Sequence, residues 1–241
     1  MQRSGEIFRR VQELLRELNL PERVEADLLR VLEAAQPSPL PLIAALGDEA
    51  GLTREEILGR GAGLFLSYCA GHLADDLMDG DCDYIDPPRI GPCLQFLLQN
   101  LSQACLARTE IPRAVLAAAG LELARAAGPQ PLEVLAAGPD AALYRRLCAA
   151  LGHEWIAFLK LLWADTPLAE RAERVGLALG IAGNVALDVQ SHDPRLTTLA
   201  TAEQAEILAW ASQAAALLRA EGLRSLADFL ADLDPWLRRP S

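Results

Sequence analysis

The chain has 241 residues, which suffices for one large domain or at most two small ones. Acidic residues outnumber basic ones by 33 to 22, the net charge is −11 and no Lys/Arg stripe occurs, so we expect neither nucleic acid nor an anionic membrane surface as a partner. Alanine and leucine dominate an apolar fraction of 51%, whereas aromatic residues make up 5%, a composition typical of packed helices.

Apolar residues recur at three- and four-residue steps along most of the chain, which indicates helices. Proline and glycine clusters, beginning with the breaker stretch Gln36–Pro39, separate most of the periodic segments. The pattern predicts helices at about residues 7–18, 21–35, 40–50, 54–79, 93–107, 112–126, 141–163, 168–190, 201–220 and 223–233.

Two of these helices begin with the spacing of a capping box, in which two side chains satisfy backbone donors at a helix start. The residues are Thr53 with Glu56, and Thr201 with Gln204. No hairpin signal, fixed-period repeat or low-complexity tract occurs. We therefore expect an all-α fold in which about ten helices form a single domain over residues 1–241.

The cysteines and the hydropathy pattern indicate the cellular compartment in which the protein is expected. Five cysteines are an odd number, include no C-x-x-C pair and lie mostly within helical apolar patterns. Residues 1–10 are charged and lack the apolar stretch of a signal peptide, and no run of 18 apolar residues occurs. We expect a reduced, cytoplasmic protein without a membrane span.

A dense group of carboxylates ends the longest expected helix. On a helix, Asp75 and Asp79 stand one turn apart on the same face, and Asp76 lies about 100° round. Three carboxylates so close repel one another unless a cation neutralises them, and hard oxygen ligands suit Mg²⁺. The whole run contains six aspartates within twelve residues: Asp75, Asp76, Asp79, Asp81, Asp83 and Asp86.

A solvated acidic helix end is the alternative interpretation of this group. Residues 61–74, just before the aspartates, are apolar on all sides and predict a buried helix, which favours carboxylates placed at the mouth of a cavity. A calcium loop of the EF-hand type is disfavoured, because Tyr84 stands at the position of the turn glycine and Ile90 at that of the final glutamate.

An all-helical chain with Asp-Asp-Leu-Met-Asp at the end of a buried helix resembles the trans-polyprenyl diphosphate synthases. The likeness covers most of the chain in helix order and implies the terpenoid-synthase fold, an orthogonal helix bundle around a central apolar cavity. It also implies that Asp75, Asp76 and Asp79 are catalytic and bind Mg²⁺, which bridges to the diphosphate of an allylic isoprenoid. In this family the metal stabilises the leaving diphosphate as a Lewis acid, and an allylic carbocation remains.

The second acidic motif of that family, close to G-x-x-F-Q-x-x-D-D-x-x-D, matches residues 180–191 in part. Leu187 stands for the first aspartate of the motif and Ser191 for the last, so Asp188 is the carboxylate that remains.

Asn184, Asp188 and His192 nevertheless recur at i, i+4 and i+8, and would share one face if the helix continued that far. This spacing is similar to the second metal motif of terpene cyclases. Asn184 and Asp188 are therefore candidate Mg²⁺ ligands, and a polar stripe that faces solvent is the alternative.

Other departures from the family concern the positive groups that hold phosphates. Residues 36–41 align with the family's G-K-x-x-R-P segment, whose Lys and Arg bind isopentenyl diphosphate, and contain neither. The arginine pair just beyond the first motif is absent, and the first arginine there is Arg89. The Lys-Thr pair of a middle helix is missing, with Arg145 and Arg146 close to its place. These three arginines are the candidate substrate-binding cations.

Phe65, Tyr68, Gly71 and His72 precede the aspartates and are candidates for substrate contacts. In the family, bulky side chains here close the cavity floor, so the small Gly71 predicts room for a C15 to C20 tail. Ordinary helix packing is the alternative. His72 lies one turn before Asp76 and is either a support for a metal-bound carboxylate or a satisfied core histidine.

Three functions remain open. The first is an enzyme that ionises one allylic diphosphate, either a terpene synthase or a prenyltransferase with a non-standard acceptor. The second is a non-catalytic or regulatory subunit of a prenyl diphosphate synthase, and the third is a chain-elongating synthase. The intact first motif and the missing isopentenyl site favour the first. We expect a homodimer, or a heterodimer with an active synthase.

Overall fold

The computed structural model describes residues 2–35, 38–136, 138 and 140–237, and every regular element among them is helical. The expected all-α class is thereby confirmed. Gln36 and Pro37 of the breaker stretch lie outside the described residues. The chain divides into two compact units, Met1–Ile111 (the N-terminal unit) and Pro112–Ser241 (the C-terminal unit). A single domain over residues 1–241 and a central apolar cavity stay predictions.

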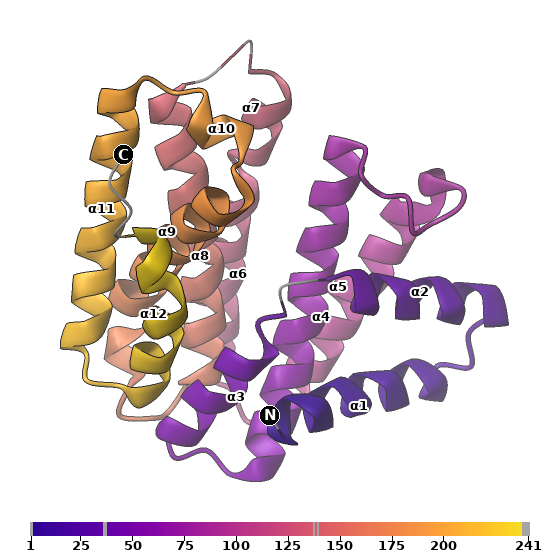
Figure 1. The fold of residues 1–241 in the computed structure, drawn as a ribbon. Coiled ribbons are helices and arrows are strands. Elements are labelled where there is room, and N and C mark those ends of the chain that lie inside the picture. Colours follow the sequence, from indigo (N-terminus) through magenta and orange to yellow (C-terminus); the bar gives the residue numbers. More distant parts are fainter. Residues whose placement is uncertain (1, 36–37, 137, 139, 238–241) are drawn as a thin grey trace. The chain divides into compact units, whose positions relative to one another are not determined.

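The N-terminal unit is built around the long helix α4, which lies along α5 (Figure 1). Leucines, isoleucines and valines of all its helices pack together, including Ile7, Leu28, Leu66, Leu73 and Leu98. The elements are α1 (Gln2–Glu17), α2 (Glu22–Ala34), α3 (Leu40–Glu49), α4 (Arg54–Asp79), the 3-10 helix η1 (Pro88–Ile90) and α5 (Gly91–Ala107).

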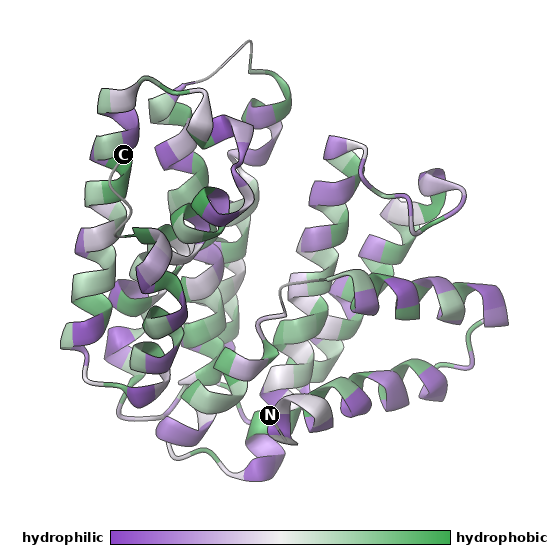
Figure 2. Ribbon diagram, in the orientation of Figure 1, coloured by the Kyte–Doolittle hydropathy of each residue, from purple (hydrophilic) through white to green (hydrophobic). Residues whose placement is uncertain are grey.

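Helix α4 begins with the predicted capping box. The Thr53 hydroxyl accepts the Glu56 backbone N–H at 3.3 Å, and the Glu56 carboxylate accepts the Thr53 N–H at 2.8 Å. The residues from Gly61 to Ala70 are mostly buried, whereas the end of the helix carries hydrophilic residues (Figure 2), and its last two residues are exposed. The sequence thus predicts both the start of α4 and the change from an apolar body to a polar end.

The C-terminal unit is a bundle in which α8 lies between α6 and α9, with α11 and α12 packed on α9 (Figure 1). Helices α8 and α9 approach closely where Gly152 faces Gly180. The elements are α6 (Arg113–Ala127), α7 (Gln130–Val134), α8 (Ala141–Leu162), the 3-10 helix η2 (Ala169–Arg171), α9 (Ala172–Ser191), α10 (Pro194–Thr197), α11 (Thr201–Ala220) and α12 (Arg224–Leu237).

Helix α9 ends at Ser191, within a residue of its predicted end, and His192 adopts the left-handed conformation with φ 59°, so the face of Asn184 and Asp188 does not continue to His192. The capping box predicted for the start of α11 is wrong, because the capping residue lies one position before Thr201. The cap of α11 is Ala200, whose N–H is accepted by Glu203 at 3.1 Å, and its methyl group offers no oxygen in return.

In the part of the chain that the structure describes, no helix is both long and apolar enough to cross a bilayer.

Candidate functional site

The aspartate-rich segment forms the last turns of α4. Asp75 and Asp76 are half-buried, and Asp79 is the exposed final residue of the helix. Gly80 then takes a left-handed φ of 80°, which glycine adopts without strain, and its N–H bonds back to the Asp76 carbonyl. The chain therefore turns sharply just after the third carboxylate.

The loop after α4 folds back onto one of these aspartates. Cys82 and Ile85 are buried and anchor the loop in the core of the unit. Between them, the Tyr84 hydroxyl donates a hydrogen bond of 2.5 Å to Oδ2 of Asp76. Burial and this carboxylate raise the pKa of Tyr84, so its hydroxyl stays protonated and donates at neutral pH.

His72 approaches the other oxygen of the same aspartate. Its Nε2 lies 3.2 Å from the Ala34 carbonyl, which can only accept, so Nε2 carries the proton. Its Nδ1 lies 3.8 Å from Oδ1 of Asp76, and the Tyr68 ring stacks on the imidazole at 6.0 Å. The structure thus places His72 between the end of α2 and Asp76, bonded to the Ala34 carbonyl and too far from the carboxylate for a hydrogen bond. Its role beside a metal-bound carboxylate stays a prediction.

The remaining candidate contact residues of α4 differ in exposure. Phe65 is 1% exposed and packs against Phe8, with ring centroids 5.9 Å apart. Tyr68 is half-buried, and Gly71 is exposed. Phe65 is therefore part of the core of the unit, and a contact of any of the three with a substrate stays a prediction.

The second candidate ligand group is a buried polar cluster in the C-terminal unit. Asp188, on α9, is 5% exposed, and its Oδ2 accepts the Tyr144 hydroxyl at 2.6 Å and the Asn184 amide at 3.0 Å. The same amide lies 3.2 Å from the Cys148 sulfur. Burial raises the pKa of Asp188 to about 6, because the hydrogen bond from Tyr144 and the charge of Arg195 offset its loss of hydration only in part.

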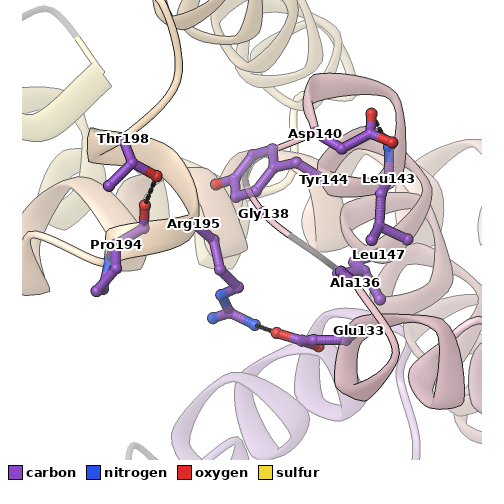
Figure 3. Close-up of a pocket in the computed structure, with 10 residues that line it drawn as sticks. All are labelled: Glu133, Ala136, Gly138, Asp140, Leu143, Tyr144, Leu147, Pro194, Arg195 and Thr198. Atoms are coloured by element: carbon purple, nitrogen blue, oxygen red, sulfur yellow. Dashed lines mark hydrogen bonds and ion pairs between the residues drawn. The ribbon is translucent and has the colours of Figure 1, made fainter.

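Arg195 lies in α10, the short helix that follows α9, and borders this cluster. Asp193 caps α10 by accepting the Arg195 backbone N–H, and it also accepts the guanidinium at 3.0 and 2.8 Å. A second arm donates to Glu133 at 2.5 Å (Figure 3), and Nη2 lies 3.6 Å from Oδ1 of Asp188. Tyr144 and Arg195 line a pocket of about 230 Å³.

The predicted substrate-binding arginines lie on the surface of their units. Arg145 is paired with Glu206 at 3.0 Å, and Arg146 is exposed on the same helix. Arg89 is exposed on η1. Asp75 and Asp188 belong to different units, so a shared metal site for the two motifs stays a prediction.

A larger pocket, of about 820 Å³, lies in the N-terminal unit at the other end of α4. Its lining includes Glu56, Arg60 and Ala62 from that helix. At 1.5 Å per residue, Ala62 and Asp75 are about 20 Å apart along the helix, so this pocket is not part of the aspartate-rich site.

The carboxylates at the end of α4 fit magnesium by their chemistry. Among the described residues, no group of three or more His, Cys, Asp or Glu side chains is gathered closely enough to hold a metal by itself. Mg²⁺ does not require such a cage, because it keeps several waters and takes phosphate oxygens together with one or two carboxylates. Asp75, Asp76 and Asp79 provide such oxygens at an open helix end, whereas Asp188 is enclosed by its own neighbours.

Three residues that contact the candidate carboxylates were not anticipated from the sequence: Tyr84, Tyr144 and Arg195. Tyr84 and Tyr144 carry no spacing signal, since each meets its aspartate through tertiary folding. Asp193-Pro194 does carry a signal, because a capping aspartate followed by proline is typical of a helix start, and it would have located Arg195 just after a cap.

Comparisons with known proteins find solved structures that are similar to this one. No family model matches the chain, and no curated protein matches it in sequence. A geranyltransferase from Legionella pneumophila shares the fold with a TM-score of 0.73 and 18% identity, over 99% of this chain and 93% of that one. A geranyltranstransferase from Thermotoga maritima has a TM-score of 0.68 and 15% identity, over 97% and 98% of the two chains.

An FPP/GFPP synthase from Zymomonas mobilis is also similar, with a TM-score of 0.62 and 19% identity over 94% of each chain. These identities are too low to carry an activity across, but the likeness in fold extends over nearly the whole chain. The chain has a fold like that of the trans-polyprenyl diphosphate synthases, as the aspartate-rich motif and the helical pattern predict, with a strongly diverged sequence.

Proposed function

We propose that this protein binds one allylic isoprenoid diphosphate through Mg²⁺ at Asp75, Asp76 and Asp79, and ionises it as a terpene synthase or a prenyltransferase with a non-standard acceptor. The observation that carries the proposal is the placement of these carboxylates at the open end of an otherwise buried helix, in a fold shared with prenyltransferases. The named relatives support a prenyl-synthase-like activity.

In this proposal the three aspartates bind the metal and their neighbours position them. The three aspartates would hold the metal, which supplies Lewis-acid stabilisation of the leaving diphosphate when bound. Tyr84 fixes Oδ2 of Asp76 through its hydrogen bond, so less rotamer freedom is lost when a ligand arrives. Support of the same carboxylate by His72 stays a prediction.

A non-catalytic subunit is the second candidate function. It is favoured by the enclosure of Asp188, the carboxylate that remains of the second motif, by residues of its own unit. Such a subunit would keep the fold and the affinity for a diphosphate and would depend on an active partner chain for turnover. A homodimer, a heterodimer and a cytoplasmic location stay predictions.

The test is incubation of the full chain with Mg²⁺ and geranyl, farnesyl or geranylgeranyl diphosphate, with and without isopentenyl diphosphate. Released diphosphate and the organic extract are both analysed. Diphosphate release with a hydrocarbon or alcohol product, without isopentenyl diphosphate, supports the proposal. A longer prenyl diphosphate would instead identify a chain-elongating synthase.

Binding is measured separately, by the rise in the thermal unfolding midpoint on addition of Mg²⁺ with a diphosphate analogue. Asp76→Asn should abolish this rise, because it removes a ligand oxygen of the motif. The matched control is Asp83→Asn, an exposed carboxylate of the same acidic run that lies beyond the helix end. Binding without turnover favours the non-catalytic subunit, whereas no rise in the native chain would refute both candidates.

A further inference from the structure

The carboxylate of Asp188 is already occupied by groups of its own unit. Its Oδ2 accepts hydrogen bonds from Tyr144 at 2.6 Å and from Asn184 at 3.0 Å, and its Oδ1 faces the guanidinium of Arg195 at 3.6 Å. The residue is 5% exposed. Mg²⁺ coordination at Asp188 would therefore require these contacts to be broken in a buried place, where lost hydrogen bonds are costly.

Arg195 is fixed in position by acidic groups from three segments of the unit. Glu133 on α7 accepts one arm at 2.5 Å, and Asp193 at the cap of α10 accepts two N–H groups at 3.0 and 2.8 Å. Together with Asp188 on α9, three carboxylates surround a single guanidinium. Carboxylates so close repel one another, and a planar guanidinium reduces that repulsion because it meets several carboxylates at once.

The outer side of α9 next to this cluster offers no replacement carboxylate. Leu187 is 39% exposed and Ser191 is exposed, at the two positions where a second aspartate-rich motif would carry carboxylates. The carboxylate that remains points inward to Tyr144. The sequence change and the geometry thus agree that this helix presents no open pair of carboxylates.

We propose that Arg195 is the resident cation of the cluster, and that its guanidinium takes the place predicted for Mg²⁺ at Asp188 and Asn184. The C-terminal unit then pairs its remaining acidic residue with Arg195 and binds no metal there. The argument uses contacts within this unit alone and does not depend on the diphosphate site of the N-terminal unit.

The test removes the first motif so that any remaining response to metal reports on the second. In a D75N/D76N/D79N chain, MgCl₂ alone at millimolar concentration should leave the thermal unfolding midpoint unchanged. Addition of Arg195→Gln takes the cation away from Glu133, Asp188 and Asp193, and Mg²⁺ should then raise the midpoint by roughly 2–4 °C, as expected for weak binding to a chain of this length.

Arg219→Gln is the matched control, because Arg219 is paired with Asp234 on the surface of the same unit, away from the cluster. It should leave the D75N/D76N/D79N chain unresponsive to Mg²⁺. A response with Arg195 intact that Asp188→Asn removes would overturn the proposal, and so would a folded Arg195→Gln chain that ignores the metal.

If Arg195→Gln prevents folding, isothermal titration of Mg²⁺ into the otherwise native chain decides the question. Asp188→Asn should leave the Mg²⁺ affinity and stoichiometry of the native chain unchanged. A loss of one bound ion, or a tenfold weaker affinity, would identify Asp188 as a metal ligand. Failure of the diphosphate site alone would show in the turnover and analogue experiments and would leave these outcomes unaffected.

Discussion

Gly180 is the position at which a single methyl group should do most damage to the C-terminal unit. A Cβ built there would lie 2.2 Å from the backbone nitrogen of Gly152, 2.4 Å from its Cα and 2.6 Å from the carbonyl carbon of Leu151. All three are backbone atoms of α8, so no side chain can rotate away. Gly180→Ala therefore forces the two helices apart.

The cost follows from the size of that displacement. Ordinary contact begins near 3.4 Å, so α8 and α9 must separate by 3.4 − 2.2 = 1.2 Å at this point. Overpacking of a tight core costs about 1–3 kcal/mol, and the upper end applies where backbone meets backbone. Alanine regains about 1 kcal/mol through its better helix propensity. The free energy of unfolding should fall by about 2 kcal/mol.

Urea unfolding followed by tryptophan fluorescence measures this change in the right part of the chain. All four tryptophans lie in the C-terminal unit, so the signal reports on that unit alone: Trp155, Trp163, Trp210 and Trp236. The control is Gly120→Ala, because Gly120 lies within helix α6, is exposed and has no atom within 4 Å of a built Cβ.

The two alanine substitutions should have opposite signs. Gly120→Ala should raise the free energy of unfolding by about 0.5–1 kcal/mol through propensity and a less flexible unfolded chain. If Gly180→Ala stabilised the protein to the same extent, the close approach of α8 and α9 would be wrong, and with it the wall that holds Asp188 against Tyr144.

Three further measurements test individual contacts. Tyr84→Phe removes the donor to Asp76 and should lower the unfolding free energy by about 1 kcal/mol in circular dichroism; an unchanged midpoint would refute the contact. Asp188 has a raised pKa of about 6 against 3.8, so its favourable contribution is complete below pH 3.8 and is lost as pH rises through 6. Relative to Asp188→Asn, native stability should fall by about 2 kcal/mol between pH 4 and 7, and parallel pH profiles would contradict this. Cys93 is the exposed thiol and should react with a disulfide reagent in the native protein, whereas the four buried thiols should react only after unfolding; several fast native thiols would contradict the burial.

Helix positions followed closely from the sequence, because periodicity and caps are local signals. The Thr53 box and the left-handed Gly80 bound α4 within a residue of its predicted ends. Local rules failed where packing outweighs them. Helix α12 runs to Leu237, four residues beyond its expected end and through Pro235, although proline disfavours a helix interior. Leu233 and Leu237 are both buried, so packing favours this extension.

The candidate site could be predicted only where its chemistry depends on local signals. The carboxylates of α4 could be named, since their chemistry depends on spacing along one helix. The partners that decide what a carboxylate does come from distant segments: Tyr144 lies 44 residues before Asp188, and no pattern in the sequence joins them.

The end of α4 also has a consequence for the evolution of the protein. The carboxyl end of a helix carries a partial negative charge, and α4 places Asp75, Asp76 and Asp79 there with no basic residue in its last turn. Each such charge opposes the helix dipole by about 0.3–1 kcal/mol. Selection for stability alone would not favour three carboxylates at this helix end. The function proposed for them would therefore be one for which the fold tolerates a less stable helix end.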